Sequence, residues 1–419
     1  MTDTQVLVHV DLDGVPVPVG RLWARVRRGR ESASFEYDQG WLTHPDRFSL
    51  EPALTLGPGP FHTAAGRSLF GALGDSAPDR WGRVLMRRAE RRRAGRAGES
   101  PRTLREIDYL LRVDDEARQG ALRLAEVEGG PFLAAAEATR IPPLLELPRL
   151  FSAAENVIAD TDSDEDLRLL LAPGSSLGGA RPKASIRDRD GHLALAKFPH
   201  RDDEIDTVRW ESTALALAQR AGLTVPAWRL EMVADRAVLV LRRFDRTASG
   251  RIPFLSAMSM LGAEDHATRS YLELVDVLRR YGSAPKEDMR ALWRRIVFSI
   301  LISNTDDHLR NHAFLHGGPD GWRLAPAYDL NPVPVDVKPR VLTTAIDLDD
   351  TRASLDLARG VAEYFELSDR EARTIAAEVG QAVAAWRQEA ARHGLPAAAI
   401  DRMASAFEHE DLAIARRLR

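Results

Sequence analysis

The chain of 419 residues contains no cysteine, and only four of its 58 basic residues are lysines. Without cysteine it can form no disulfide, no thiolate zinc site and no cysteine nucleophile, which fits a cytoplasmic protein. It also lacks any apolar run near the ~20 residues that a membrane-spanning helix requires, and no signal peptide opens it. We therefore expect a cytoplasmic protein that does not associate with membranes.

The composition is that of a soluble globular protein, with 44% apolar and 29% charged residues. The net charge of −4 gives the molecule as a whole no strong attraction for nucleic acid. Arginine replaces lysine almost everywhere, so each remaining lysine marks a position that favours a compact ammonium group over a planar guanidinium. Two of the four, Lys183 and Lys197, lie within fifteen residues of each other, beside a glycine-rich segment.

The length predicts two or three domains. Period-2 alternation from Val6 to Tyr37, with a turn at Asp13-Gly14, predicts a β-rich subdomain within residues 1–105. From about Asp75 the pattern predicts a helix with Ser76 as its N-cap, then a loop over the glycine- and arginine-rich stretch from Arg93 to Pro101. A second helical stretch covers roughly Thr103 to Arg112. Residues 173–245 predict a loop, a strand, a turn at Asp188–Gly191, a strand, a helix near 206–221 and two further strands. Residues 246–419 are almost entirely helical in pattern. Ser368 and Glu371 there form a capping box for a helix expected to reach about His393.

The segment from Pro173 to Lys183 is rich in glycine and serine. Its backbone N–H groups and hydroxyls suit the wrapping of phosphates. Gly174 and Gly179 have the P-loop spacing, but Ala180-Arg181 follow them instead of Lys-Ser/Thr, so the segment is not a Walker motif. Alone, such a segment is most often a turn.

Lys197 ends a predicted strand and shares a face with Leu193 and Leu195. An ammonium on an apolar face requires an anion, or it extends past the strand end to reach water. Glu211, on the helix that follows, shares a face with apolar residues and is a candidate partner. A strand lysine paired with a helix acid behind a glycine-rich loop is the phosphate-binding arrangement of a kinase N-lobe.

A second cluster of polar residues follows an apolar helix near 293–302. Asp306 and Asn311 have the D-x-x-x-x-N spacing that joins a catalytic base to a metal ligand in phosphotransfer loops. Asp329 offers a further carboxylate, and Mg²⁺ prefers such oxygen ligands. Asp307 is an alternative to Asp306, because adjacent acids often share a solvated loop.

Two further patterns have competing interpretations. His308, His312 and His316 are four residues apart and could bind zinc, although no HExxH glutamate accompanies them. The run from Arg80 to Arg96 contains arginines at 80, 83, 87 and 91 on one helical face. A solvated face is the default interpretation of this run, and an acidic partner or nucleic acid is the alternative.

Together these motifs resemble the HipA family of toxin serine/threonine kinases. The resemblance rests on Ser175–Lys183, Ala196–Pro199, Arg243–Arg246, Asn304–Asn311 and Tyr328–Leu330, with Phe70–Arg83 similar to the N-terminal region of that family. It covers nearly the whole chain. One difference is that Arg181-Pro182 precede the loop lysine, where the best-known members carry Gln-Glu.

The resemblance implies an ATP- and Mg²⁺-dependent protein kinase that phosphorylates a cellular protein to arrest growth. It implies autophosphorylation of Ser176 and neutralisation by a HipB-like helix-turn-helix antitoxin, which would provide an indirect link to DNA. Asp306 would be the base, Lys197 would bind the ATP phosphates, and Asn311 and Asp329 would bind the metal. The remaining ATP-binding positions would be Ser176, Gly178, Gly179, Lys183, Glu211, Arg242, Arg243, Phe244 and His308.

We therefore expect an α+β, two-lobed protein-kinase-like fold. It would comprise an N-terminal β-rich subdomain (1–105), an N-lobe with the glycine-rich loop (106–245) and a large all-helical C-lobe (246–419). A small-molecule phosphotransferase and a catalytically silent scaffold of a DNA-bound complex are the alternative functions.

Overall fold

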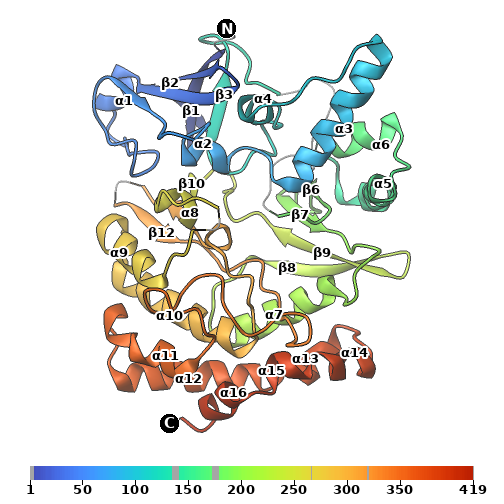
Figure 1. The fold of residues 1–419 in the computed structure, drawn as a ribbon, viewed down its shortest axis with the longest axis vertical. Coiled ribbons are helices and arrows are strands. Elements are labelled where there is room, and N and C mark those ends of the chain that lie inside the picture. Colours follow the sequence, from blue (N-terminus) through green and yellow to red (C-terminus); the bar gives the residue numbers. More distant parts are fainter. Residues whose placement is uncertain (1–3, 135–140, 172–178, 266, 319, 419) are drawn as a thin grey trace. The chain divides into compact units, whose positions relative to one another are not determined.

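The computed structural model describes residues 4–134, 141–171, 179–265, 267–318 and 320–418 (Figure 1). The chain forms two compact units that exchange segments along the sequence. The first contains Met1–Arg201 and Glu231–Leu255, and the second contains Asp202–Leu230 and Ser256–Arg419. The chain passes between them after Arg201, within β8 (Trp228–Val233) and within β10 (Phe254–Ser256).

The first unit begins with the predicted β-rich subdomain, an antiparallel five-stranded sheet of order β4-β3-β2-β1-β5. Val6, Val8 and Val10 are buried as the alternation predicts. Asp13 and Gly14 both have positive φ, the geometry of the predicted hairpin turn. The strands are β1 (Thr4–Leu12), β2 (Val15–Arg27), β3 (Arg30–Tyr37), β4 (Pro60–His62) and β5 (Leu122–Ala125).

The α-helices in the described residues of this unit are α1 (Gln39–Thr43), α2 (Gly71–Asp75), α3 (Arg80–Ala97), α4 (Glu106–Leu111), α5 (Leu147–Ala159) and α6 (Asp164–Leu171). The expected cap of α3 was wrong. Asp79, not Ser76, caps α3 by accepting from the Gly82 N–H at 2.7 Å, while the Ser76 hydroxyl donates to the Leu73 carbonyl. The helix also continues through the stretch expected to be a loop, since Arg96 pairs with Asp164 at 2.9 Å.

A second sheet of order β6-β7-β9-β8 contains the predicted Asp188–Gly191 turn between its first two strands. Its strands are β6 (Lys183–Arg187), β7 (Leu193–Lys197), β9 (Arg236–Arg242) and β8. Ala184, Ile186, Ala194 and Ala196 pack on α3, α5 and α6 in one core. Side chains alternate between the two faces of a strand, so the other residues of β6 and β7 lie on the opposite face. They include Lys183 and Lys197.

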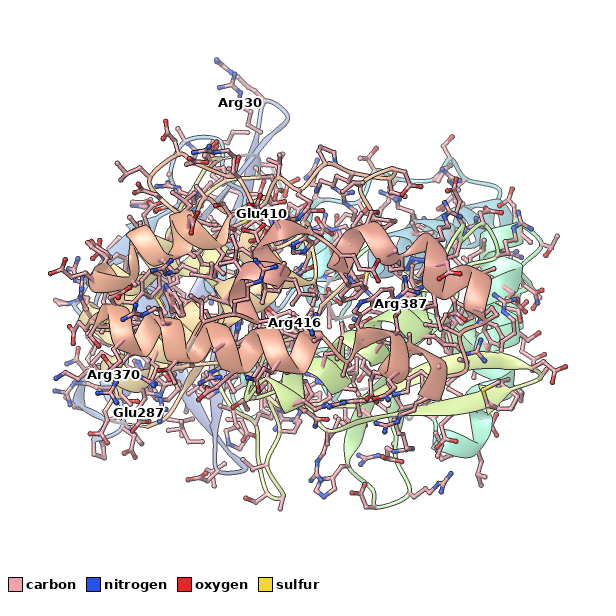
Figure 2. All side chains as sticks on the ribbon, turned by 90° about the horizontal axis from the view of Figure 1, so that it is seen from below. Arg30, Glu287, Arg370, Arg387, Glu410 and Arg416 are labelled. Carbon is pink, nitrogen blue, oxygen red and sulfur yellow. The ribbon has the colours of Figure 1, made fainter. Side chains whose placement is uncertain are left out.

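The second unit is mainly helical, with the hairpin of β11 (Ala313–His316) and β12 (Trp322–Leu324) added, so the predicted lobe is not all-helical. Its helices are α7 (Thr207–Arg220), α8 (Ala257–Met260), α9 (Tyr271–Tyr281), α10 (Pro285–Leu301), α11 (Leu355–Gly360), α12 (Asp369–Val383), α13 (Trp386–Arg392), α14 (Ala397–Arg402), α15 (Ala404–Phe407) and α16 (Glu410–Ala415). Helix α12 packs on α7 and α10 (Figure 1). The outward faces of the C-terminal helices carry charged side chains such as Arg370, Arg387, Glu410 and Arg416 (Figure 2).

Two differences from the expected organisation have the same cause. The capping box of Ser368 and Glu371 is confirmed, but the helix it begins ends at Val383, and α13 starts at Trp386. The break allows the Trp386 ring to stack on Phe407, with ring centroids 4.5 Å apart. Trp210 of α7 lies against both rings. This aromatic core places α7 in the second unit, whereas the expected boundaries grouped it with residues 106–245.

No helix in the described part of the chain is both long and apolar enough to cross a lipid bilayer.

Candidate active site

Lys183 and Lys197 are direct cross-strand partners in the β6–β7 pair of the first unit. Residues at opposite positions project to the same face of a sheet, so both ammonium groups leave the face away from the hydrophobic core. Like charges at opposite positions repel each other. Such a pair needs carboxylates or a bound anion close by.

Lys183 has one such carboxylate. Its Nζ lies 2.8 Å from Oδ2 of Asp79, and both side chains are buried. The other carboxylate oxygen of Asp79 caps α3, so one side chain serves both the ammonium and the helix N-terminus. Trp81 adds a bond from Nε1 to the Lys183 carbonyl at 3.0 Å. Asp79 is not among the predicted site residues, although its position before the helix that starts at Arg80 is a capping signal.

The end of the glycine-rich segment lies over this ammonium group. A Cβ on Gly179, whose φ is 111°, would lie 2.9 Å from Lys183 Nζ. A side chain there would collide with the ammonium, and an L-residue would be strained in that conformation. Ser176 and Gly178, the other residues predicted in this segment, lie outside the described residues.

The resemblance implies that Arg242 to Phe244 lie in the hinge that binds the adenine, and this segment starts at the last residue of β9. The Arg243 side chain does not point toward a ligand: it is buried, and it donates to the Ala117 and Arg118 carbonyls and to Asp245. A hinge contact by Arg243 would therefore involve its backbone. Arg242 is exposed, and the Phe244 ring lies 6.5 Å from that of Phe254.

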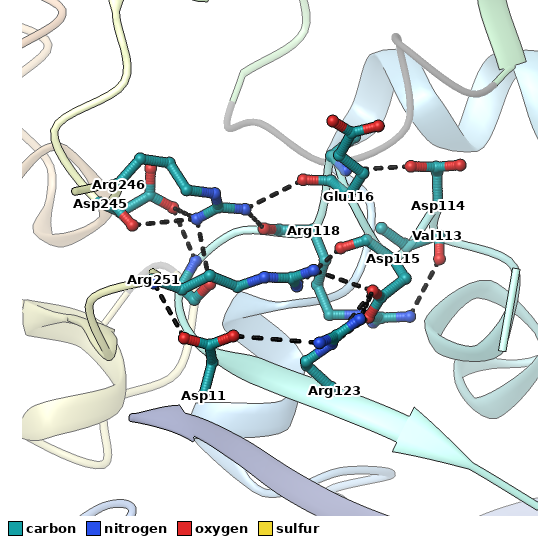
Figure 3. A network of polar contacts seen from close by, with 12 residues as sticks. Asp11, Val113, Asp114, Asp115, Glu116, Arg118, Arg123, Asp245, Arg246 and Arg251 are labelled. Carbon is teal, nitrogen blue, oxygen red and sulfur yellow. Dashed lines mark hydrogen bonds and ion pairs between the residues drawn. The ribbon is translucent and has the colours of Figure 1, made fainter. Parts of the chain in front are cut away.

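Asp245 belongs to a buried network of arginine and aspartate side chains that joins β1, the loop 113–120 and residues 245–251 (Figure 3). Burial would raise the pKa of Asp245, but the guanidinium groups of Arg243 and Arg246 hold it well below its ordinary value. Arg251 adds a bond to Asp115 at 2.8 Å, and its backbone N–H donates to Asp11. The network anchors the hinge segment to the N-terminal subdomain within the first unit.

In the second unit, the D-x-x-x-x-N segment lies in the loop that follows α10. The Asp306 side chain is exposed, while Thr305 and Asp307 on either side are buried. Asn311 Nδ2 donates to the Asp306 carbonyl at 2.8 Å, which closes the five-residue spacing into a compact turn. Since the donor end of this amide is used, its carbonyl oxygen is the end that remains for a cation.

Asp307 has a different environment. Its Oδ2 accepts from the Tyr271 hydroxyl at 2.5 Å and its Oδ1 from the Thr343 N–H at 2.7 Å. Burial raises its pKa to about 6, although these donors favour the charged form. A carboxylate enclosed by protein donors cannot reach an acceptor hydroxyl. Of the two alternatives, the geometry favours Asp306 as the reacting carboxylate.

The segment that contains Asp329 packs on the same loop. The Tyr328 hydroxyl donates to the Arg310 carbonyl at 2.7 Å, and the Asn331 N–H donates to Asn304 Oδ1 at 3.2 Å. Asp329 has a φ of 53°, a left-handed conformation uncommon for a non-glycine residue. The structure thus brings the Asp306–Asn311 loop and the Asp329 segment together, as the two motifs require.

The donor set of this loop suits magnesium and does not suit zinc. Asn311 and Asp329 present hard oxygen atoms, which Mg²⁺ prefers. His312 is buried against Tyr271, with Nε2 3.2 Å from its hydroxyl, and burial lowers its pKa to about 3. His316 packs edge-on against Trp322. Among the residues that the structure describes, no three His, Cys, Asp or Glu side chains cluster to hold a metal ion.

Glu211 on α7 and His308 within the Asp306–Asn311 loop complete the predicted site residues in the described part of the chain. Glu211 is buried on α7 of the second unit, while Lys197 belongs to the first, so their pairing stays a prediction. His308 is half-buried, and its Nδ1 has no hydrogen-bond partner within the described ranges.

Comparison with known proteins places the chain in a family. Residues 175–386, just over half of the chain, match the family model of the HipA-like C-terminal domain. A Sinorhizobium fredii protein named "Putative kinase Y4mE" is 25% identical over 343 residues, covering 74% of this chain and 75% of its own length. A Haemophilus influenzae protein named "Putative kinase" is 23% identical over 195 residues, covering 41% of this chain and 56% of its own length.

Among solved structures, the HipA–HipB–operator DNA complex of the Shewanella oneidensis MR-1 toxin–antitoxin system contains a chain similar in fold. The TM-score is 0.66 at 17% identity, and the match covers 98% of this chain and 97% of that one. The predicted two-lobed, kinase-like α+β fold is confirmed. The predicted family is confirmed as well: this chain belongs to the HipA-like C-terminal domain family.

Proposed function

We propose that the protein is an ATP- and Mg²⁺-dependent serine/threonine protein kinase of HipA type that acts in the cytoplasm. The observation that carries the proposal is the exposed Asp306 carboxylate between two buried neighbours, with Asn311 bonded to its backbone five residues on. A carboxylate held in this way can accept a proton from a hydroxyl group, and the adjacent amide oxygen suits a metal.

In the proposed reaction, the acceptor hydroxyl transfers its proton to Asp306 as its oxygen attacks the γ-phosphorus of ATP. The bond from that phosphorus to the bridging oxygen breaks, and ADP leaves. Lys197, with Glu211, positions the phosphates. Ser176, Gly178, Gly179 and Lys183 of the glycine-rich segment would bind the ATP phosphates. Bound Mg²⁺, held by Asn311 and Asp329, would neutralise charge on the phosphates.

Incubation with radiolabelled ATP and Mg²⁺, followed by gel and thin-layer separation, tests the proposal. Label on protein, lost in Asp306→Asn, is the expected result. Label on a small metabolite would instead favour the small-molecule phosphotransferase. No transfer by a folded wild-type protein would leave the scaffold as the remaining function. Asp265→Asn, an exposed aspartate paired with Arg310, is the matched control.

Autophosphorylation of Ser176 is the second element of the proposal. A phosphate adds about two negative charges and three acceptor oxygens. Arg181 and Lys183, five and seven residues on, would bind it and hold the loop away from the ATP phosphates. Peptide mapping after incubation with ATP should locate the phosphate on Ser176, and Ser176→Asp should bind ATP weakly. A phosphate on Ser175, or on neither serine, would contradict this part alone.

The third element is a HipB-like helix-turn-helix antitoxin with a link to operator DNA. The similar Shewanella chain was solved in a complex of HipA, HipB and operator DNA. Much of the α3 arginine run is used internally, since Arg83 pairs with Glu106 and Arg88 with Asp162.

Arg87 and Arg91 are exposed. Their reversal to Glu should weaken assembly with a HipB-type antitoxin and operator duplex, with a steep salt dependence and unchanged kinase activity. The double variant Arg370→Glu with Arg416→Glu is the control. Equal assembly of this control and the Arg87/Arg91 double variant would indicate that α3 presents only a solvated face.

A further inference from the structure

The loop that carries Asp306 is held in place by a segment more than thirty residues further along the chain. We define the strap as residues 338–344, which lie in the second unit with the loop. Lys338 Nζ and Thr343 Oγ1 both donate to the Thr305 carbonyl, each at 3.0 Å. Two donors from the strap therefore fix one carbonyl directly before Asp306.

The strap also holds the residue directly after Asp306. The Thr344 hydroxyl donates to the Asp307 carbonyl at 2.7 Å, and the Thr343 N–H donates to the Asp307 carboxylate at 2.7 Å. At the start of the loop, Arg340 donates to the Ser303 hydroxyl at 3.1 Å. The strap thus binds both neighbours of Asp306, whose own side chain stays exposed.

From these contacts we infer that Lys338, Thr343 and Thr344 are positioning residues for the phosphotransfer step. The inference rests on the proposed function, in which Asp306 is the base. General-base catalysis depends on the distance between carboxylate and hydroxyl, and displacements near 1 Å can cost roughly a hundredfold in rate. Fixing the backbone on both sides places the Asp306 carboxylate without enclosing it.

The lysine content of the chain supports a specific role for Lys338. Lys338 is one of only four lysines, and the other 54 basic residues of the chain are arginines. It is half-buried and donates to a backbone carbonyl. Lys286, by contrast, is exposed on the first turn of α10. It provides a control of the same charge.

The test compares Lys338→Met, Thr343→Val and the double variant. Because the two side chains share one acceptor, either can hold the Thr305 carbonyl when the other is lost. We expect each single change to lower kcat about two- to threefold and the double change to lower it more than the product of the two, by roughly tenfold or more. ATP affinity, measured by calorimetry in the presence of Mg²⁺, should stay within about twofold.

Amide hydrogen exchange over residues 304–308 provides a readout that does not require catalysis. Exchange should accelerate in the double variant at an unchanged melting temperature and stay normal in Lys286→Met. Lys338→Arg, which keeps a donor but not the compact ammonium, should restore it only in part. Unchanged exchange or unchanged kcat in the double variant would overturn the inference, as would a loss of kcat matched by lost ATP affinity. A folded wild type without any phosphotransfer would overturn the proposed function instead, and the exchange data would then decide whether the strap holds the loop.

Discussion

Lys183 and Asp79 form a buried ion pair between residues 104 positions apart, with Nζ and Oδ2 at 2.8 Å. The pair places a negative charge beside one of two lysines that face each other across β6 and β7. The same carboxylate caps α3, so the N-terminal helix and the strand next to the glycine-rich loop depend on one side chain. This relationship assigns Lys183 a structural partner and distinguishes its environment from that of Lys197.

Asp79→Asn should destabilise the first unit markedly. Asparagine keeps the cap acceptor but leaves the buried Lys183 ammonium without this carboxylate, and removing one partner of a buried ion pair costs about 3 kcal/mol or more. Urea unfolding of the full chain measures the change. Ser368→Ala, which removes the exposed cap of α12, should cost only about 1 kcal/mol. Equal losses in the two variants would contradict the importance of the ion pair.

Asp306→Asn should reduce phosphotransfer by roughly 10²- to 10⁴-fold while the melting temperature stays unchanged, because the side chain is exposed and contributes no core volume. Asp307→Asn should instead lower the melting temperature, since it disturbs the bonds to Tyr271 and to the Thr343 amide. Activity assays and thermal unfolding of both variants separate the two roles. Loss of activity in a stable Asp307→Asn, with an active Asp306→Asn, would reverse the assignment.

Asn311→Ala and Asp329→Ala should act together through the metal, so their effects on phosphotransfer should be non-additive. Each should weaken ATP binding in the presence of Mg²⁺ more than ATP binding in EDTA. Calorimetric titrations under the two conditions measure the difference. Equal weakening with and without Mg²⁺ would remove these residues from the metal site.

Lys197→Arg should be poorly tolerated, although arginine provides nearly all other positive charges of this chain. A planar guanidinium cannot replace a compact ammonium between phosphates and Glu211 without displacing one of them. Steady-state kinetics with varied ATP would show the loss. Near-normal ATP affinity and turnover in this variant would show that position 197 does not require a lysine.

Glu51→Gln should change the pH dependence of stability. Glu51 is buried and accepts from the Ala72 N–H at 2.6 Å, and burial raises its pKa from an ordinary value of 4.5 to about 7. The folded protein therefore holds this proton more tightly than the unfolded chain. Between about pH 4.5 and 7 the free energy of unfolding of the wild type should fall relative to the Gln variant, by about 3 kcal/mol at most. Parallel curves from urea unfolding at several pH values would contradict the shift.

The sequence identified the features that depend on near neighbours. Alternation from Val6 to Val10, the Asp13-Gly14 turn and the capping box of Ser368 all appear where expected, because strand faces, turns and caps are set by residues a few positions apart. The spacing of Asp306 and Asn311 likewise predicted one compact loop, and the bond from the Asn311 amide closes it.

Only the tertiary structure determines which side chains are buried and which residues from distant parts of the chain contact them. Adjacent aspartates are equivalent in a sequence, and only the enclosure of Asp307 by Tyr271 and the strap separates it from Asp306. Nothing local indicates that Arg243 points into a buried network, or that α7 packs with the C-terminal helices. Local periodicity determines which way a side chain faces along its own element, but the energetic cost of burying a charge depends on groups that the fold brings from elsewhere in the chain.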